Sequence, residues 1–375
     1  MLERCPEGIR TVLKVLLGDL KSKESLTGIG LFGSWSRADA EPSSDVDLLI
    51  VDKRCFEYSY VERAEIGNNL LDLEYVPAEW VLPQIRPELD QKLYEAQILY
   101  DRTGALTRAK EMMLRIYSSP ERVQIRAGNC LIEADTYISR AASAYDKKDF
   151  QSSKANAGIA FEAALRIFVD AAMLPFSNSR FIRASESATK KFGVRKLYDD
   201  YLVVAGLAGL DVQRTGRMLD SVLAMWKVVM SYVQANSSTV GTLHVRAMNA
   251  LNYYGKESFL KGFAARTSAL IKDGLFAEAA HYMVHTSASL LENYACLVSV
   301  VEKTRFDFTS LFRLLRDSQT SPCEVYRKAV DAFGLEKVTG REAEESLEKT
   351  KETVLAIRRK RGEIIARLPP EHRKG

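Results

Sequence analysis

Two aspartates, Asp45 and Asp47, stand two residues apart at the start of an aliphatic run over residues 48–51. On a strand, side chains two residues apart leave the same face, so both carboxylates point one way while Val46 and Leu48 point into a core. Converging carboxylates supply the hard oxygen ligands that Mg²⁺ prefers. Transfer of a nucleotide from a triphosphate needs such cations to neutralise the phosphates and activate the attacking oxygen. The pattern therefore predicts a magnesium site, most simply a two-metal site, for nucleotidyl transfer.

A third carboxylate is available on a neighbouring predicted strand, where apolar and acidic residues alternate over residues 71–75. This alternation places Asp72 and Glu74 on one face of that strand. Either Asp72 or Glu74 can complete the cluster, so that three carboxylates lie within reach of one metal ion.

A Gly-Ser pair precedes the aspartates and suits a phosphate-binding turn. Gly33 allows the backbone to approach a triphosphate closely, and the Ser34 hydroxyl can donate a hydrogen bond to a phosphate oxygen. A short helix that begins here would direct free N–H groups at the same anion. Arg37 lies one turn further on, where it can offset phosphate charge; a surface ion pair is the alternative for this side chain.

The same stretch also matches a second motif. The G-x-G-x-x-G dinucleotide fingerprint is formed by Gly28, Gly30 and Gly33. That fingerprint works only in the turn between a strand and a helix. A helix and a charged turn precede Gly28, and the residues after Ser34 are too few and too polar for a packed crossover helix. We therefore reject dinucleotide binding.

The segment over residues 33–51 closely resembles the signature of the DNA polymerase beta-like nucleotidyltransferase superfamily, with the minimal and the aminoglycoside nucleotidyltransferases as the most similar branches. The signature is Gly-Ser, an Arg three residues after the Ser, and then Ser-Asp-x-Asp followed by apolar residues. The matching residues are Gly33, Ser34, Arg37, Ser44, Asp45 and Asp47. Ala38 departs from the pattern, since many members carry Gly there. The resemblance covers roughly residues 25–80.

The resemblance implies a magnesium-dependent transferase in which Gly33, Ser34, Arg37 and Ser44 bind the nucleotide and Asp72 is the third carboxylate. It also implies ATP or another nucleoside triphosphate as the donor. In the aminoglycoside enzymes a helical domain supplies the acceptor pocket and a carboxylate general base. By this resemblance Glu162, in an otherwise apolar predicted helix, is the candidate base, because burial would raise its pKa. A buried structural glutamate is the alternative.

The elements that would position these residues form a small α+β unit followed by an all-helical region. Apolar spacing predicts a helix over residues 7–20, and strands are predicted over 29–33, 45–53 and 71–75. A helix over 90–104 closes the unit. Helical periods dominate from residue 106 onward. We expect a nucleotidyltransferase domain over 1–105, a helical bundle over 106–240 and a C-terminal helical domain over 241–375.

Composition and charge limit the setting in which this protein works. The formal net charge is +4 over 375 residues, which does not require a nucleic-acid partner. Five dispersed cysteines without a C-x-x-C pair favour a reducing compartment, and no apolar run approaches the roughly 18 residues of a membrane span. We expect a cytoplasmic protein without a membrane partner; an oligomer remains open.

Two histidines in the helical region, His281 and His285, are spaced i, i+4 like the ligands of zinc proteases. Tyr282 stands where the catalytic Glu of those enzymes belongs, and no third ligand is evident from the sequence. The spacing therefore favours a core or interface pair over a metal site.

These features predict nucleotidyl transfer to an acceptor hydroxyl, and the resemblance implies AMP from ATP as the group moved. A small-molecule acceptor is favoured because the chain lacks a strongly basic face, while an RNA 3′ end or a protein side chain stays open. The rival hypothesis is a non-catalytic nucleotide-binding protein, antitoxin-like or a scaffold.

Overall fold

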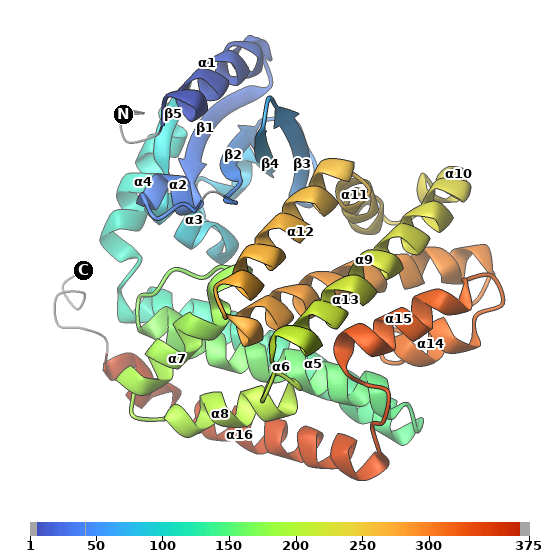
Figure 1. Ribbon diagram of the computed structural model, residues 1–375. Coiled ribbons are helices and arrows are strands. Elements are labelled where there is room, and N and C mark those ends of the chain that lie inside the picture. The colour runs from blue at the N-terminus through green and yellow to red at the C-terminus, as the bar shows by residue number, and fades with distance from the viewer. Residues whose placement is uncertain (1–5, 42, 368–375) are drawn as a thin grey trace. The chain divides into compact units, whose positions relative to one another are not determined.

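The computed structural model describes residues 6–41 and 43–367, which divide into two compact units (Figure 1). The first unit contains residues 6–119 and 252–266; the second contains 120–251 and 267–367. This division differs from the expected boundaries at residues 105 and 240. The first unit continues to residue 119, and residues 241–251 and 267–367 group with 120–240. Whether three regions fold separately stays a prediction.

The first unit is built around a mixed sheet, which has five strands within the described residues. The spatial order is β3-β4-β2-β1-β5, and β2 and β4 are the parallel neighbours while the other pairs are antiparallel. The elements are α1 (Glu7–Ser22), β1 (Leu26–Phe32), α2 (Gly33–Arg37), β2 (Val46–Asp52), β3 (Tyr60–Ile66), β4 (Asn69–Pro77), α3 (Asp90–Glu95), β5 (Gln97–Asp101) and α4 (Ala105–Ile116), with short 3-10 turns at Ala78–Trp80 and Pro87–Leu89.

Helix α1 covers one face of this sheet (Figure 1). Its apolar residues recur at helical spacing and are buried against alternate residues of β1, β2 and β4, including Leu48 and Leu73. On the opposite face, Gly28 of β1 lies so close to Leu106 of α4 that an added Cβ would meet its side chain at 3.1 Å. Because successive strand residues alternate between faces, the acidic residues between the buried ones must project away from α1.

Two strands were not expected from the sequence, and one expected helix is only partly present. The segment 90–104 forms a helix only as far as Glu95, and Gln97–Asp101 then pairs with β1 as strand β5. Strand β3 is an edge strand with charged residues, joined to β4 through Gly67, whose φ is +63°. A Gly-Asn pair between two extended segments is a hairpin signal, so the turn was recognisable although the charged residues of β3 hid the strand itself.

The second unit is entirely helical in its described residues (Figure 1). Its helices are α5 (Pro120–Asp146), α6 (Phe150–Ala171), α7 (Phe181–Lys191), α8 (Arg195–Val204), α9 (Val212–Ala235), α10 (Ser237–Val240), α11 (Val245–Tyr254), α12 (Glu257–Lys272), α13 (Phe276–Val301), α14 (Leu311–Asp317), α15 (Cys323–Phe333) and α16 (Gly340–Ala366), with a 3-10 turn at Asn178–Arg180. The last residues of α11 (252–254) and the larger part of α12 (257–266) belong to the first unit. The predicted fold class, an α+β domain followed by an all-helical region, is confirmed.

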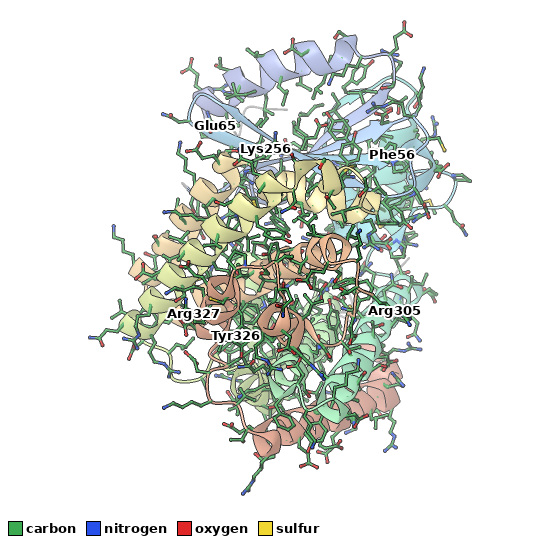
Figure 2. The ribbon with its side chains drawn as sticks, turned by 90° about the vertical axis from the view of Figure 1, so that its right-hand side faces the viewer. Phe56, Glu65, Lys256, Arg305, Tyr326 and Arg327 are labelled. Carbon is green, nitrogen blue, oxygen red and sulfur yellow. The ribbon has the colours of Figure 1, made fainter. Side chains whose placement is uncertain are left out.

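Burial in the helical unit follows the apolar periods of its helices. Helices α6 and α13 are buried around most of their circumference, whereas charged side chains such as Arg305 and Arg327 are exposed (Figure 2). Among the described residues, no helix combines the length and the apolar composition that crossing a membrane requires.

Candidate functional site

Four acidic residues project from neighbouring parallel strands on the face of the sheet opposite α1. In the register of β2 and β4, Asp47 lies beside Asp72 and Leu49 lies beside Glu74. Asp45 immediately precedes β2. The buried partners Val46 and Leu48 face the core, as the alternation predicted, so Asp45 and Asp47 leave the same side of their strand.

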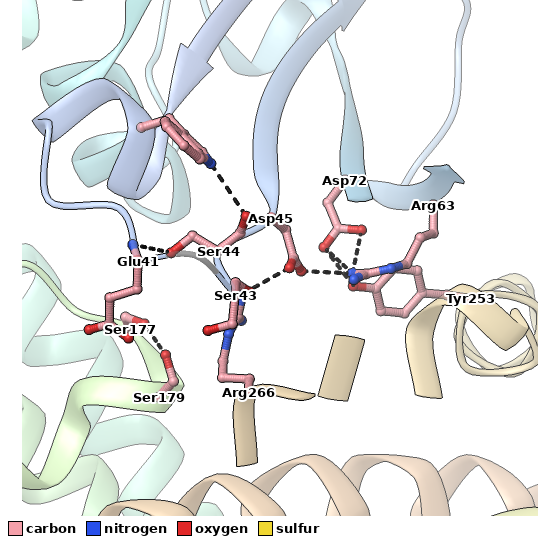
Figure 3. Close-up of polar contacts among 11 residues, drawn as sticks. Glu41, Ser43, Ser44, Asp45, Arg63, Asp72, Ser177, Ser179, Tyr253 and Arg266 are labelled. Atoms are coloured by element: carbon pink, nitrogen blue, oxygen red, sulfur yellow. Dashed lines mark hydrogen bonds and ion pairs between the residues drawn. The ribbon is translucent and has the colours of Figure 1, made fainter. Parts of the chain in front are cut away.

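Two arginines contact these carboxylates (Figure 3). The Arg63 Nη1 atom donates to Asp45 Oδ2 and to both carboxylate oxygens of Asp72, each at 2.9 Å. Arg266 Nη2 donates to Asp45 Oδ1 at 2.8 Å and to the Ser43 carbonyl at 2.9 Å. The hydroxyl of Tyr253 donates to Asp72 Oδ2 at 2.9 Å.

Arg63 is the best buried of these cations, and its contacts show how the acidic charge is balanced. Its side chain is 2% exposed. Burial lowers the pKa of its guanidinium, but the charges of Asp72 and Asp45 outweigh burial and raise it, so Arg63 stays protonated. Burial raises the pKa of Asp72 to about 6 although Arg63 opposes it. A buried ion pair of this kind is costly to break from one side, because the partner is then left buried and uncompensated.

Asp47 is the carboxyl group of the cluster that no arginine or lysine of the described residues contacts directly. Within the described residues its carboxylate makes no ion pair or hydrogen bond. Burial, followed by the charges of Asp72 and Asp45, raises the pKa of Asp47 well above its ordinary value. Glu74, by contrast, pairs with Lys92. One more cation beside Asp47 would therefore relieve the repulsion in the cluster.

The cluster offers oxygen donors alone, which fits Mg²⁺, but its carboxylates do not converge on one point. The guanidinium of Arg63 stands between Asp45 and Asp72, contrary to the expected convergence on one metal. An ion shared by those two aspartates would have to compete with Arg63. Of the two candidates for third ligand, Asp72 pairs with the same arginine as Asp45, whereas Glu74 pairs with Lys92.

The Gly-Ser turn packs directly against this cluster. Gly33 follows β1 with φ +74°, and an added Cβ would lie 2.5 Å from Asp47 Oδ2. Helix α2 then begins, and its C-cap Ala38 also has a left-handed φ of 62°. That conformation costs a non-glycine residue about 1–2 kcal/mol, which explains why Gly is the more usual residue there; the turn forms nevertheless.

Comparison with known proteins gives a family match for the part of the chain that carries the aspartates. Residues 13–102 match the family model described as a nucleotidyltransferase domain. This part of the chain is a nucleotidyltransferase domain. A solved nucleotidyltransferase-like protein from Exiguobacterium sibiricum is similar at 11% identity, over 87% of this chain and 89% of that one, with a TM-score of 0.33. No curated protein sequence matches the chain. The match to the family model confirms the resemblance inferred from the Gly-Ser and Asp-x-Asp spacing.

The nucleotidyltransferase domain depends on glycine at position 33 for space as well as for backbone conformation. We expect Gly33→Ala to lower the melting temperature, since left-handed strain costs about 1–3 kcal/mol, and to displace Asp47 so that any transfer activity is lost. Gly67→Ala is the matched control, because Gly67 also has a positive φ but open space around its Cβ position. Equal activity of the two variants in a transfer assay would refute the Gly33–Asp47 contact as a requirement.

The predicted phosphate-binding groups of the nucleotidyltransferase domain are partly engaged by Glu95. Arg37 Nη1 donates to Glu95 Oε2 at 2.6 Å, and the Gly33 N–H donates to the same oxygen at 3.3 Å. Arg37 thus forms an ion pair, which was the alternative to a phosphate contact for this side chain. The Ser34 hydroxyl has no hydrogen-bond partner among residues 6–41 and 43–367, whereas Ser44 Oγ accepts the Glu41 N–H at 2.9 Å (Figure 3).

Glu95 presents a carboxylate to the two groups that were expected to bind phosphate, so it should compete with a triphosphate. We expect Glu95→Gln to tighten nucleotide binding by about tenfold, because hydrogen bonds to charged groups contribute about 1.5–3 kcal/mol and 1.4 kcal/mol is a factor of ten. Calorimetric titration with ATP and Mg²⁺ measures this change. Weaker binding would instead make Glu95 a positioning residue for Arg37.

Glu162 belongs to the helical unit and not to the nucleotidyltransferase domain. Burial acts to raise the pKa of Glu162, but His285 and His281 outweigh it and lower that pKa well below its ordinary value. The expected rise is therefore wrong, because the sequence did not reveal the two histidines as its partners. The assignment of Glu162 as general base stays a prediction, and a carboxylate of lowered pKa is a weaker base.

Proposed function

We propose that this protein is a magnesium-dependent nucleotidyltransferase that moves AMP from ATP to an acceptor hydroxyl. The observation that carries the proposal is the pairing of Asp47 with Asp72 on adjacent parallel strands, beside a glycine turn so close to Asp47 that an added Cβ would lie 2.5 Å from its carboxylate. The match of residues 13–102 to a nucleotidyltransferase domain supports nucleotidyl transfer as the reaction class.

Asp45, Asp47 and Asp72 are the residues that would hold the metal, with Glu74 next to them. Bound Mg²⁺ supplies charge neutralisation at the phosphates and activation of the attacking oxygen. The Ser34 hydroxyl and Gly33 orient the phosphates, and Arg37 adds positive charge once it leaves Glu95. Arg63 and Arg266 balance the aspartates in the state described here and release them as nucleotide binds.

A small-molecule acceptor is favoured by the mild net charge of +4, since a phosphate backbone is gripped by clustered basic residues. RNA and protein acceptors belong to the same reaction class and are separated by experiment. A second function is favoured by one observation: Arg63 already occupies the space between Asp45 and Asp72. A protein that keeps this arrangement would bind nucleotide without turnover, as an antitoxin-like module or a scaffold would.

The test is to incubate the full chain with Mg²⁺ and ATP labelled at the α-phosphate, together with a small-molecule extract, total RNA or a protein extract. Transfer of the α label with release of pyrophosphate, in one of these mixtures, is the expected result. A parallel sample with ATP labelled at the γ-phosphate should give no labelled acceptor. Tight ATP binding without label transfer in any mixture would support the non-catalytic module instead.

A further inference from the structure

The helical unit contains a three-residue cluster that the proposed nucleotidyl transfer does not use. Glu162 of α6 faces His281 and His285, which lie one turn apart on α13. Among the described residues, these three form the group whose ligand atoms all lie within 4.8 Å of one another. The sequence offered the histidine pair but no third ligand, because Glu162 stands more than a hundred residues earlier in the chain.

The distances within the cluster suit a shared ion. His281 Nε2 lies 3.2 Å from Glu162 Oε2, and His285 Nδ1 lies 3.1 Å from Glu162 Oε1. Around a tetrahedral zinc ion with bonds of about 2.1 Å, neighbouring ligand atoms are about 3.4 Å apart. Both glutamate–histidine distances are therefore within a few tenths of an ångström of the ligand spacing, and all three ligand atoms lie within 4.8 Å of one another.

His281 provides an independent sign that a cation belongs here. Its ring is 3% exposed, and its Nδ1 lies 3.2 Å from the carbonyl oxygen of Asn178. A carbonyl can only accept, so Nδ1 carries the hydrogen and orients the ring, as the outer hydrogen bond of a metal-binding histidine does. Phe181 stacks on the same ring at 4.7 Å between centroids. Both contacts hold Nε2 in place.

The Nε2 atom of His281 is buried and has no hydrogen-bond partner within the described chain. The Glu162 carboxylate oxygen lies 3.2 Å from Nε2 without a hydrogen bond between them, a separation that two ligands of one ion can have. A buried polar atom left without a partner otherwise costs about 1–3 kcal/mol.

We propose that Glu162, His281 and His285 bind one zinc-class divalent ion that links α6 to α13. Two imidazoles and one carboxylate are a borderline donor set that suits zinc and related transition metals and not Mg²⁺. The pocket beside the cluster, lined in part by Tyr201, Lys154 and Phe333, has a volume of about 50 Å³. That is room for a water as the fourth ligand. This inference does not depend on the proposed nucleotidyl transfer.

The experiment is a zinc titration of the full chain, stripped of metal and held in excess Mg²⁺, which occupies the aspartate cluster without competing for imidazoles. We expect one zinc ion per chain, visible absorption of a nitrogen-ligated site when Co²⁺ replaces zinc, and a higher melting temperature with zinc. His285→Ala should lower the affinity at least about 100-fold and remove the thermal shift. His285 is 30% exposed, so this variant is expected to fold.

His244→Ala is the matched control, because His244 is exposed and lies outside the cluster. It should keep the stoichiometry and the thermal shift of the unaltered chain. Absence of zinc binding in the unaltered chain would overturn the proposal and leave Glu162 as an ion-pair partner of the two histidines. Equal zinc binding by the His285→Ala and His244→Ala variants would overturn it as well, since the ion would then lie elsewhere.

Discussion

Asp47→Asn is expected to abolish nucleotide transfer while raising the melting temperature of the protein. Metal coordination contributes several kcal/mol of charge stabilisation and each 1.4 kcal/mol is a factor of ten, so the loss of rate should be at least about 100-fold. The stability gain follows from removing a carboxylate that burial and the charges of Asp72 and Asp45 disfavour. Functional sites commonly trade stability for activity in this way.

Label transfer and calorimetric melting measure the two effects on the same preparation. Asp19→Asn is the matched control, because Asp19 lies on the exposed side of α1, and this variant should change neither quantity appreciably. Normal transfer by the Asp47→Asn variant would contradict the role of this carboxylate. A lower melting temperature would contradict the account of its electrostatic cost.

The stability difference between the Asp47→Asn variant and the unaltered protein should grow as pH rises. Because the pKa of Asp47 is raised in the folded protein, the folded chain keeps a proton that the unfolded chain releases near pH 4. Above pH 4 the unfolded state binds fewer protons, so the stability of the unaltered protein falls until the folded carboxyl has also ionised. Asparagine has no such proton. Urea unfolding at pH 4 and pH 8 measures the difference, and a gap that shrinks toward pH 8 would contradict this sign.

Arg63→Met is expected to destabilise the protein by about 3–5 kcal/mol without divalent cations, and Mg²⁺ should restore part of the loss. The guanidinium of Arg63 contacts both Asp45 and Asp72, and removing one side of a buried ion pair leaves the other side uncompensated. The vacated position lies among carboxylates, so a divalent ion can replace the lost charge. The Mg²⁺-dependent shift in melting temperature should therefore be larger in the variant than in the unaltered chain.

Lys261→Met is the matched control for this experiment. Lys261 pairs with Glu65 at 3.0 Å, and its side chain is 67% exposed, so its loss should cost less than about 1 kcal/mol. Its response to Mg²⁺ should equal that of the unaltered chain. If Mg²⁺ stabilises the Arg63→Met variant no more than the control, Arg63 and the metal do not compete for the same aspartates.

The strands that hold the candidate site could be predicted because buried apolar residues alternate with acidic residues along them. Val46 and Leu48 alternate with Asp45 and Asp47, and Leu71 and Leu73 enclose Asp72, so each acidic residue had to face away from the core. The order of the strands did not follow from this pattern. That β2 and β4 are parallel neighbours depends on β3 entering the sheet as an edge strand, and its charged residues concealed it.

The cations of the site could not be predicted from local sequence. Arg63 lies on the unrecognised strand β3, and Arg266 and Tyr253 come from helical residues about 200 positions after the aspartates they contact. Only tertiary packing brings them together: Gly262 of α12 lies so close to Arg63 that an added Cβ would meet its Nη2 at 2.7 Å. A single arginine in a helical pattern carries no signal of such a partner.

The central claim, that Asp45 and Asp47 bind divalent cations together with a nucleoside triphosphate, is tested most directly by Mn²⁺ binding measured with electron paramagnetic resonance. The unaltered chain and the Asp45→Asn/Asp47→Asn double variant are compared with and without an ATP analogue whose α,β bridging oxygen is a methylene group. We predict that the analogue increases Mn²⁺ binding to the unaltered chain and that the double variant loses this increase. Equal nucleotide-dependent Mn²⁺ binding by both proteins would contradict the claim.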